Sequence, residues 1–215
     1  MLVAGIDEAG RGPVIGPLVL AAVWVEAPAG LRALRRLGAR DSKTLDAGTR
    51  ERLAEKIRAM ATRVELEIAS AAVVDAHARR GALNVLERRM AEAMLLRGPD
   101  AARIVADGAR LFSPMRSRYP QLLARDRADA AHAAVAAASI VAKDERDRRF
   151  LRLAGRCGDL REAARAGMGY VNAATERFLC AYHRRYGRLP LGTRLSWDWA
   201  PLRRLCDRQL DLPLA

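Results

Sequence analysis

The sequence predicts an α/β protein in which a mixed central β-sheet is flanked by helices. In the earlier part of the chain, short apolar runs typical of strands alternate with helical patterns, whereas the later part shows helical patterns only. This order, β-β-α-β-α-β-α, suits a single sheet covered by helices. At 215 residues the chain is long enough for one substantial core and short for two. We therefore expect a main domain at residues 1–155 and a helical C-terminal extension at residues 156–215, packed on it.

The chain opens with an apolar run, Leu2–Ala4, that predicts the first strand. Asp7 and Glu8 arrive where this strand is expected to finish. Neighbouring residues of a regular strand point to opposite faces, so two adjacent carboxylates can serve one site only where the strand twists away or ends. The glycine- and proline-rich stretch that follows is expected to provide that ending. An ordinary hairpin with an acidic, glycine-rich turn is the alternative.

The loop after this strand contains Gly10-Arg11-Gly12, which offers backbone N–H donors with no Cβ in the way and one guanidinium. Such a loop suits close approach to a sugar–phosphate chain. The apolar run Leu18–Val23 then predicts a buried second strand.

Helices and strands alternate through the middle of the chain. The first predicted element is a short amphipathic helix at Leu31–Leu37. The second is a helix that begins after an N-cap at Thr44 or Asp46 and ends near Ala61. A strand at Arg63–Ser70 and one long or two broken helices at Val73–Arg97 follow. Gly81 interrupts the last of these patterns. Leu111–Tyr119 is expected to be irregular, and Gln121–Arg125 to form a further short strand.

Two more acids stand at predicted element boundaries. Asp107 ends the short apolar strand Arg103–Asp107 and precedes a glycine. An aspartate at the C-terminal edge of a strand is a common way to place an acid in an open α/β crevice, although a turn-initiating Asp-Gly pair is at least as common. Asp129 precedes an alanine-rich helix from about Ala131 to Arg152. Taken alone, it is a helix-start residue that the helix dipole favours.

The last part of the chain is helical, with one aromatic turn. Gly167-Met168-Gly169-Tyr170 predicts a flexible turn that presents a tyrosine. A helix is predicted at Ala173–Tyr186 and a basic helix at Pro201–Leu210. Trp197 and Trp199, which lie between these helices in the sequence, are expected to serve packing rather than base stacking.

The composition favours a polyanionic partner. Lys and Arg number 38 against 25 Asp and Glu, which gives a net charge of +13 spread through the whole chain. Nucleic acid is the simplest such partner. The three cysteines show no CxxC spacing, so neither a disulfide framework nor a zinc site is indicated. With no signal segment and no apolar run of about 18 residues or more, a cytoplasmic protein is expected.

Five sequence blocks in fixed order carry a family resemblance: GIDEAGRGPVIGPLVLAAV, DSKTL, IVADGA, RADA and AAASIVAK. They resemble ribonuclease HII, the type 2 ribonuclease H, over Leu2–Tyr170, and GMGY with its following helix resembles the archaeal C-terminal part of that family. The resemblance implies a ribonuclease-H-like catalytic domain with a helical extension. It also implies an endonuclease that cuts the RNA strand of RNA–DNA hybrids and single ribonucleotides embedded in duplex DNA, leaving 3′-hydroxyl and 5′-phosphate ends. Its place would be ribonucleotide excision repair and DNA replication.

The same resemblance implies roles for particular residues. The family's metal-binding, catalytic carboxylates correspond to Asp7, Glu8, Asp107 and Asp129. The loop that senses the ribose 2′-hydroxyl and the tyrosine that stacks on the sugar at the RNA–DNA junction correspond to Gly10, Arg11, Gly12 and Tyr170. Positions near backbone phosphates correspond to Lys43, Ser139 and Lys143.

Three features depart from the family pattern. Val171 follows the tyrosine where proline is usual, so the turn lacks the fixed φ of proline. Asp144 stands after Lys143 where an apolar residue is usual, which adds a negative charge. The segment between Asp107 and Asp129 is dense in arginine and alanine, so the assignment of Asp129 over the nearby Asp126 rests on matching RADA to the block before the family's Ala-Ser-Ile helix.

Phosphodiester hydrolysis explains the acidic residue types without a family. It needs an activated water and a stabilised leaving 3′-oxygen, and two divalent ions about 3.5–4 Å apart supply both. Hard ions such as Mg²⁺ or Mn²⁺ prefer carboxylate oxygens. Four acids packed together without ions should have raised pKa values.

Two other classes of protein stay open at this point: a ribonuclease-H-fold nuclease acting on DNA junctions, and a catalytically silent nucleic-acid-binding module. The expected partner is an RNA–DNA hybrid or ribonucleotide-containing duplex DNA, bound by a monomer. A sliding clamp is a further candidate partner, but Asp211–Ala215 shows no evident clamp-binding peptide.

Overall fold

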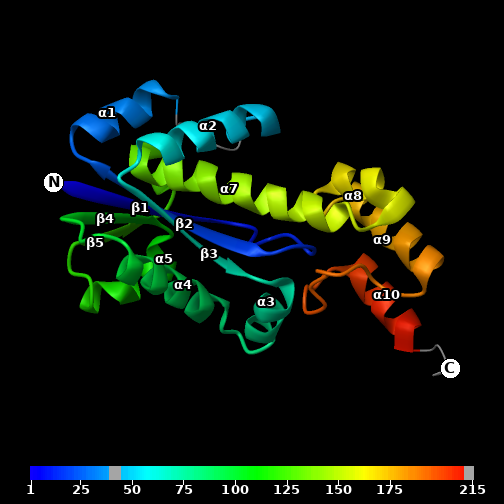
Figure 1. Cartoon of the computed structure of the whole chain (residues 1–215). Helices are drawn as coiled ribbons and strands as arrows, with labels where there is room; N and C mark the ends of the chain where they lie inside the picture. The colour runs from blue at the N-terminus through cyan, green and yellow to red at the C-terminus, as the bar shows by residue number, and fades with distance from the viewer. Residues whose placement is uncertain (39–44, 211–215) are drawn as a thin grey trace. The chain divides into compact units, whose positions relative to one another are not determined.

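A computed structural model describes residues 1–38 and 45–210 and contains one five-stranded sheet (Figure 1). The strands, in the spatial order β3-β2-β1-β4-β5, are β3 (Arg63–Ala69), β2 (Leu18–Glu26), β1 (Leu2–Ala9), β4 (Arg103–Asp107) and β5 (Leu122–Arg125). β1 pairs antiparallel with β2 and parallel with β4, and β4 pairs parallel with β5. The predicted mixed central sheet is therefore confirmed.

The helices of the described residues also follow the predicted order. They are α1 (Ala29–Arg36), α2 (Ala47–Met60), α3 (Ala71–Ala78), α4 (Leu83–Arg97), α5 (Ala109–Phe112), α6 (Ala128–Ala131), α7 (Ala133–Ala154), α8 (Arg161–Gly167), α9 (Ala173–Tyr186) and α10 (Ala200–Leu210). Asp46 caps α2 by accepting the Thr49 N–H at 3.0 Å, and Gly81 separates α3 from α4 with a φ of 63°. The pattern at 73–97 is thus two helices.

The prediction of irregular structure at Leu111–Tyr119 was wrong. α5 and a 3₁₀ helix at Ser113–Ser117 cover most of this segment. Asp126 explains part of the error, because its carboxylate accepts the Ala109 N–H at 2.8 Å and so holds the first turn of α5 from seventeen residues away. A cap this distant leaves no local sequence signal. The short helix α8 was not predicted either.

The chain forms two compact units. The first comprises residues 1–9, 19–68 and 83–145, and the second comprises residues 10–18, 69–82 and 146–215. The predicted extension, residues 156–215, lies wholly within the second unit. Residues 10–18 belong there because their backbone pairs with the C-terminal part, where the Gly16 N–H donates to Gly192 O at 2.9 Å and Ile15 bridges Thr193.

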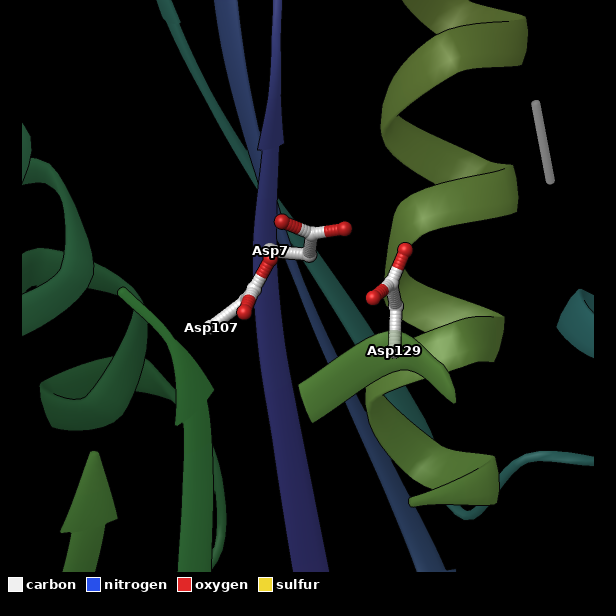
Figure 2. A group of neighbouring side chains, drawn as sticks. All are labelled: Asp7, Asp107 and Asp129. Atoms are coloured by element: carbon white, nitrogen blue, oxygen red, sulfur yellow. The ribbon is translucent and has the colours of Figure 1, made fainter. Parts of the chain in front are cut away.

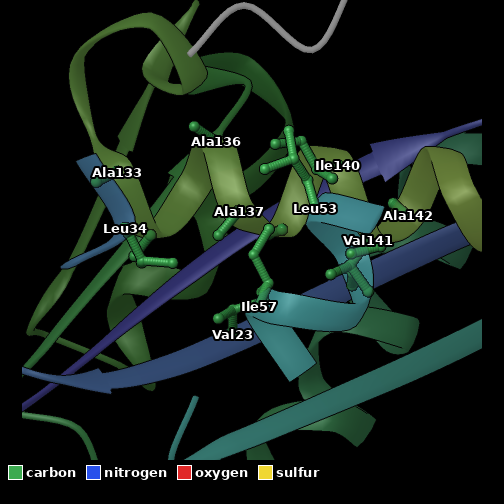
Figure 3. Close-up of a cluster of buried hydrophobic side chains, with 14 of the residues drawn as sticks. Val23, Leu34, Leu53, Ile57, Ala133, Ala136, Ala137, Ile140, Val141 and Ala142 are labelled. Carbon is green, nitrogen blue, oxygen red and sulfur yellow. The ribbon is translucent and has the colours of Figure 1, made fainter. Parts of the chain in front are cut away.

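Helices cover both faces of the sheet in the first unit. α1, α2 and the first part of α7 lie on one face, and α4 and α5 lie on the other (Figure 1). Figure 3 shows the first of these interfaces, in which Val23 of β2 meets Leu34, Ile57 and the alanines of α7. A Cβ at Gly5 would lie 2.2 Å from the Ala134 backbone. The small residues of α7 therefore bring this helix close to β1.

The other face of β2 packs through its alternate residues. Trp24 is fully buried there, and a Cβ at Gly98 would lie 2.3 Å from its ring. Gly98 therefore ends α4 where the chain must pass the indole closely. Together the two faces fix β1 and β4, which carry three of the four predicted acids.

The second unit has a core of its own. Apolar side chains of residues 10–18 and of α7, α8, α9 and α10 form one cluster: Val14, Ile15, Phe150, Ala154, Cys157, Ala164, Phe178, Leu179, Tyr182, Leu202 and Leu205. Trp197 and Trp199 pack against it, which confirms their predicted packing role. In the described part of the chain, all three cysteines are free thiols, and no helix is both long and apolar enough to span a membrane.

Candidate active site

Three carboxylates converge in the first unit (Figure 2). Oxygen atoms of Asp7, Asp107 and Asp129 all lie within 4.8 Å of one another. The register of the sheet explains the first pair. β1 and β4 are parallel neighbours with Ile6 opposite Ala106, so Asp7 and Asp107 leave adjacent strands at the same level. A role in starting a turn therefore does not account for the position of Asp107 beside Asp7.

Asp129 reaches the cluster from the short helix α6. Asp107 fixes the start of that helix, because its carboxylate accepts the Ala128 N–H at 2.8 Å. Arg127, just before it, takes a left-handed conformation with a φ of 56° and turns the chain into the helix. Asp126 points elsewhere, since it caps α5. The structure thus brings Asp129, and not Asp126, next to Asp7.

Glu8 is placed differently from the other three predicted acids. β1 ends at Ala9, just before Gly10, as expected, but both acids still lie within the paired strand, with Asp7 opposite Ala21 and Glu8 opposite Leu20. Adjacent residues of a paired strand point to opposite faces. Among the described residues, the three-carboxylate group accordingly omits Glu8. Its charge is still close enough to act on Asp7.

The pKa of Asp7 is raised well above its ordinary value. Burial is the largest cause, since only 5% of the residue is exposed, and the negative charges of Glu8 and Asp107 raise the pKa further. A hydrogen bond with the Ser139 side chain and the Glu8 N–H at 2.8 Å act in the opposite direction. The raised pKa expected of crowded acids is thus found at Asp7, and a bound cation would relieve it.

Ser139 and Lys143 lie on α7 in a hydrogen-bonded chain that leads to Asp7. Lys143 Nζ donates to Ser139 Oγ at 3.0 Å, and the fully buried Ser139 hydrogen-bonds Asp7. Their spacing of four residues places both on one helix face. The departure at Asp144 is accommodated by an ion pair with Arg58 of α2, at 2.9 Å. Lys43, predicted to lie near a phosphate, falls outside the described residues.

The predicted recognition residues lie in the second unit. The ring of Tyr170 stacks on the guanidinium of Arg146, 4.5 Å from centroid to Cζ, and 42% of the residue is exposed. The glycine loop reaches the same turn, because the N–H groups of Val14 and Ile15 donate to Gly169 O at 2.8 and 3.2 Å. Gly10-Arg11-Gly12 and Tyr170 thus belong to one hydrogen-bonded assembly within this unit.

Sequence reasoning missed two buried arginines of the second unit. Arg146 and Arg194 are both fully buried. Arg146 supports Tyr170 as described and donates to Met168 O, whereas Arg194 contacts the backbone of the glycine loop. In a chain this rich in arginine, neither stands out from the solvated ones. Even an acid four residues away, Asp198, makes Arg194 resemble an ordinary surface residue in the sequence.

The cluster of Asp7, Asp107 and Asp129 fits a divalent metal ion. It offers oxygen donors only, which hard divalent ions prefer. It also gathers negative charge around a buried carboxylate whose pKa is raised without a cation. The described residues hold no comparable group of histidine, cysteine or acidic ligands elsewhere.

A mixed sheet with helices on both faces and acids at neighbouring strands is typical of nucleases with a ribonuclease-H-like fold, and comparison with known proteins agrees. A family model described as Ribonuclease HII matches residues 4–200. The ribonuclease HII of Pyrococcus abyssi is 36% identical over 210 residues, covering 93% of this chain and 90% of that protein.

Two solved structures extend this likeness to the fold. The crystal structure of ribonuclease H2 from Pyrococcus horikoshii has a TM-score of 0.81 at 31% identity and covers 99% of this chain and 100% of its own. The RNase HII in a PCNA complex from Archaeoglobus fulgidus has a TM-score of 0.79 at 34% identity, covering 93% and 96%. The fold is that of the ribonucleases H. The chain belongs to the ribonuclease HII family and is an enzyme, a ribonuclease H that hydrolyses phosphodiesters.

Proposed function

We propose that this protein is an endoribonuclease that hydrolyses the RNA strand of RNA–DNA hybrids and cuts at single ribonucleotides embedded in duplex DNA. The products would carry 3′-hydroxyl and 5′-phosphate ends. The observation that carries the proposal is the convergence of Asp7, Asp107 and Asp129 within 4.8 Å, in a chain of this family. Its basic composition, with a net charge of +13, supports a nucleic-acid substrate.

The acids would hold divalent ions, Mg²⁺ or Mn²⁺, with two present during catalysis. Asp7, Asp107 and Asp129 provide the converging oxygens, and Glu8 is the proposed fourth ligand residue. When bound, such ions activate the attacking water and stabilise the leaving oxygen. Ser139 keeps the carboxylate of Asp7 oriented through its hydrogen bond, and Lys143 in turn holds the Ser139 hydroxyl.

The second unit would supply substrate recognition. The loop Gly10-Arg11-Gly12 is proposed to meet the ribose 2′-hydroxyl, which distinguishes RNA from DNA. Tyr170 presents a ring that Arg146 supports from one side, and the ring is proposed to stack on the sugar at an RNA–DNA junction. Lys43 and Lys143 are proposed to lie near backbone phosphates.

A sliding clamp is a proposed protein partner. The Archaeoglobus fulgidus relative was solved in complex with PCNA, and we extend an association of that kind to this chain. The C-terminal segment Asp211–Ala215 lies outside the described residues. Pull-down with a sliding clamp, using the full chain and a variant truncated after residue 210, would show whether that segment is needed.

One assay tests the proposed function. A labelled DNA duplex with one embedded ribonucleotide is incubated with the protein and Mg²⁺ or Mn²⁺, beside an all-DNA duplex, a four-way DNA junction and a long RNA–DNA hybrid. We expect cleavage next to the ribonucleotide and along the RNA strand, and none in the DNA substrates. Cleavage of the junction alone would favour a DNA nuclease. Binding without cleavage in either metal would favour a non-catalytic nucleic-acid-binding module.

A further inference from the structure

Arg194 binds the backbone of the glycine loop with its whole guanidinium group. Nη2 donates to Gly10 O at 2.6 Å, Nη1 to Arg11 O at 3.2 Å and Nε to Gly16 O at 3.0 Å. These partners are 178 to 184 residues away in the sequence. The side chain is fully buried, so these contacts are made away from water.

Trp197 engages the third carbonyl of the same tripeptide. Its Nε1–H donates to Gly12 O at 2.9 Å, and the Arg194 guanidinium lies 4.7 Å from the centroid of its ring. Each carbonyl of Gly10, Arg11 and Gly12 therefore accepts a hydrogen bond from the segment Arg194–Trp197. The loop is thus held in place through its carbonyl oxygens.

Asp75 of α3 anchors this segment in turn. Its carboxylate accepts the Leu195 N–H at 2.6 Å, the Ser196 N–H at 3.2 Å and the Ser196 hydroxyl at 2.6 Å. Asp75 is itself buried. The two residues between Arg194 and Trp197 are thus fixed by a carboxylate that has no part in the acid cluster.

Burying a guanidinium group costs free energy of desolvation, so the contacts of Arg194 must compensate for that cost. Burial, and then the positive charge of Arg146, lower the pKa of Arg194 to about 10, so the group remains a cation at neutral pH. A buried cation is tolerated only when hydrogen bonds compensate for lost hydration. Here three backbone carbonyls, together with the charge of Asp75, provide that compensation.

The planarity of the peptide bond determines what the loop presents on its other side. The C=O of one residue and the N–H of the next lie in one plane and point in opposite directions in a trans peptide. With the carbonyls of Gly10 and Arg11 directed at Arg194, the N–H groups of Arg11 and Gly12 point away from it. At Gly12 there is also room, since an added Cβ would meet no described atom within 4 Å.

We propose that Arg194, assisted by Trp197, is a positioning residue for ribonucleotide recognition. By holding the carbonyls of Gly10 and Arg11, it turns the N–H groups of Arg11 and Gly12 outward as donors to the 2′-hydroxyl oxygen of a ribose. The specificity of the loop then depends on a side chain near the C-terminus of the chain. This inference deepens the proposed function and rests on it.

The test compares binding preference in a cleavage-inactive Asp107→Asn background. Dissociation constants are measured for two duplexes of one sequence, with and without a single ribonucleotide. Arg194→Lys keeps the positive charge but loses the planar fork, and Trp197→Phe keeps the ring but loses the Nε1 donor. We expect the preference for the ribonucleotide duplex to fall about tenfold with Arg194→Lys and less with Trp197→Phe, while affinity for the all-DNA duplex stays unchanged.

A matched control is Arg97→Lys, which alters an arginine that pairs with Glu65 and Glu67 in the first unit. It should keep the preference of the background protein. Amide hydrogen exchange at residues 10–16 should be faster in Arg194→Lys and unchanged in the control. Wild-type preference in both Arg194→Lys and Trp197→Phe, or an equal loss of affinity for both duplexes, would overturn the inference. If Arg194→Lys fails to fold, Trp197→Phe decides.

Failure of the proposed function looks different. In that case the wild-type protein would cleave no ribonucleotide-containing substrate and the Asp107→Asn background would show no preference for one. The inference about Arg194 fails when that preference exists in the background protein and the variants either leave it intact or lose affinity for both duplexes equally.

Discussion

The two units of this chain hold charge in opposite ways. In the first, negative groups converge on neighbouring strands, and burial together with Glu8 and Asp107 raises the pKa of Asp7. In the second, two arginines are buried, and Arg194 donates to three backbone carbonyls with the negative charge of Asp75 acting on it. The acid cluster is thus short of positive charge and suited to bind a cation. The carbonyls of Gly10, Arg11 and Gly12 already accept hydrogen bonds, which suits the loop to keep one shape.

This difference teaches where the protein can tolerate change. Replacing one carboxylate of the acid cluster should leave the fold intact, because it relieves repulsion between like charges. The same change should reduce cleavage, because the cluster then binds a cation less well. A loop fixed by a buried cation responds in its shape and therefore in its specificity. Substitutions in the first unit should affect rate, and substitutions in the second should affect discrimination.

The largest effect is expected from Asp107→Asn. The variant keeps the shape of the side chain but removes one charge from the cluster, so cleavage should fall by about 100-fold or more, since a bound metal contributes several kcal/mol to the transition state. Binding of a hybrid should persist, because arginine and lysine contacts to phosphate supply most of it. Steady-state cleavage and filter binding measure the two. Asp126→Asn is the matched control, and loss of activity there with full activity in Asp129→Asn would show that the wrong acid is assigned.

A smaller and more selective effect is expected from Tyr170→Ala. If the ring orients a junction against the site, activity on a single embedded ribonucleotide should fall by about 10- to 100-fold, with less loss on a long hybrid that offers many productive registers. The melting temperature should change little, since 42% of the residue is exposed. Tyr186→Ala, at a similarly exposed tyrosine of α9, is the control. Unfolding, or equal loss on both substrates, would make Tyr170 a structural residue.

The raised pKa of Asp7 predicts a pH dependence of stability in the metal-free protein. The folded state binds the Asp7 proton more tightly than the unfolded state, so this residue lowers stability progressively as pH rises above its ordinary pKa of 3.8 toward the raised value. Asp7→Asn should remove that loss, and so should a saturating divalent ion. Melting temperatures in chelator across this pH range, for wild type and variant, measure the effect. A melting curve in Asp7→Asn with the same pH dependence as wild type would contradict it.

The smallest effect is expected from Val171→Pro, next to the tyrosine. Half of Val171 is exposed, at 51%, so the substitution removes little packing. Proline fixes φ and would narrow the conformations of the Gly169-Tyr170 turn. The preference for a single ribonucleotide over a long hybrid should rise slightly, by about two- to threefold at most for a few tenths of a kcal/mol. A fall in this ratio would show that the turn needs the freedom that valine leaves.

The sequence by itself determined most of the helices and strands, and it singled out Asp7 and Asp107 at strand ends. Asp107 could be assigned because an apolar run ended on it, and parallel strands end at a common edge of a sheet. The glycines and prolines between residues 5 and 17 marked a loop, and the periodicity at 173–186 gave α9 its bounds. These are local signals, since hydrophobic period and turn residues act within one or two turns of chain.

Tertiary structure alone decided which of the acids come together and which distant segments contact the glycine loop. Whether Glu8 joins Asp7 depends on how far β1 continues to pair with β2, which no residue of β1 specifies. The choice between Asp126 and Asp129 depends on which backbone N–H each acid can reach, at Ala109 or in the helix that Asp107 starts. Arg194 reaches the glycine loop across 184 residues, and its neighbours in sequence resemble those of many solvated arginines. Such contacts are set by packing between distant segments, and short-range patterns carry no record of that packing.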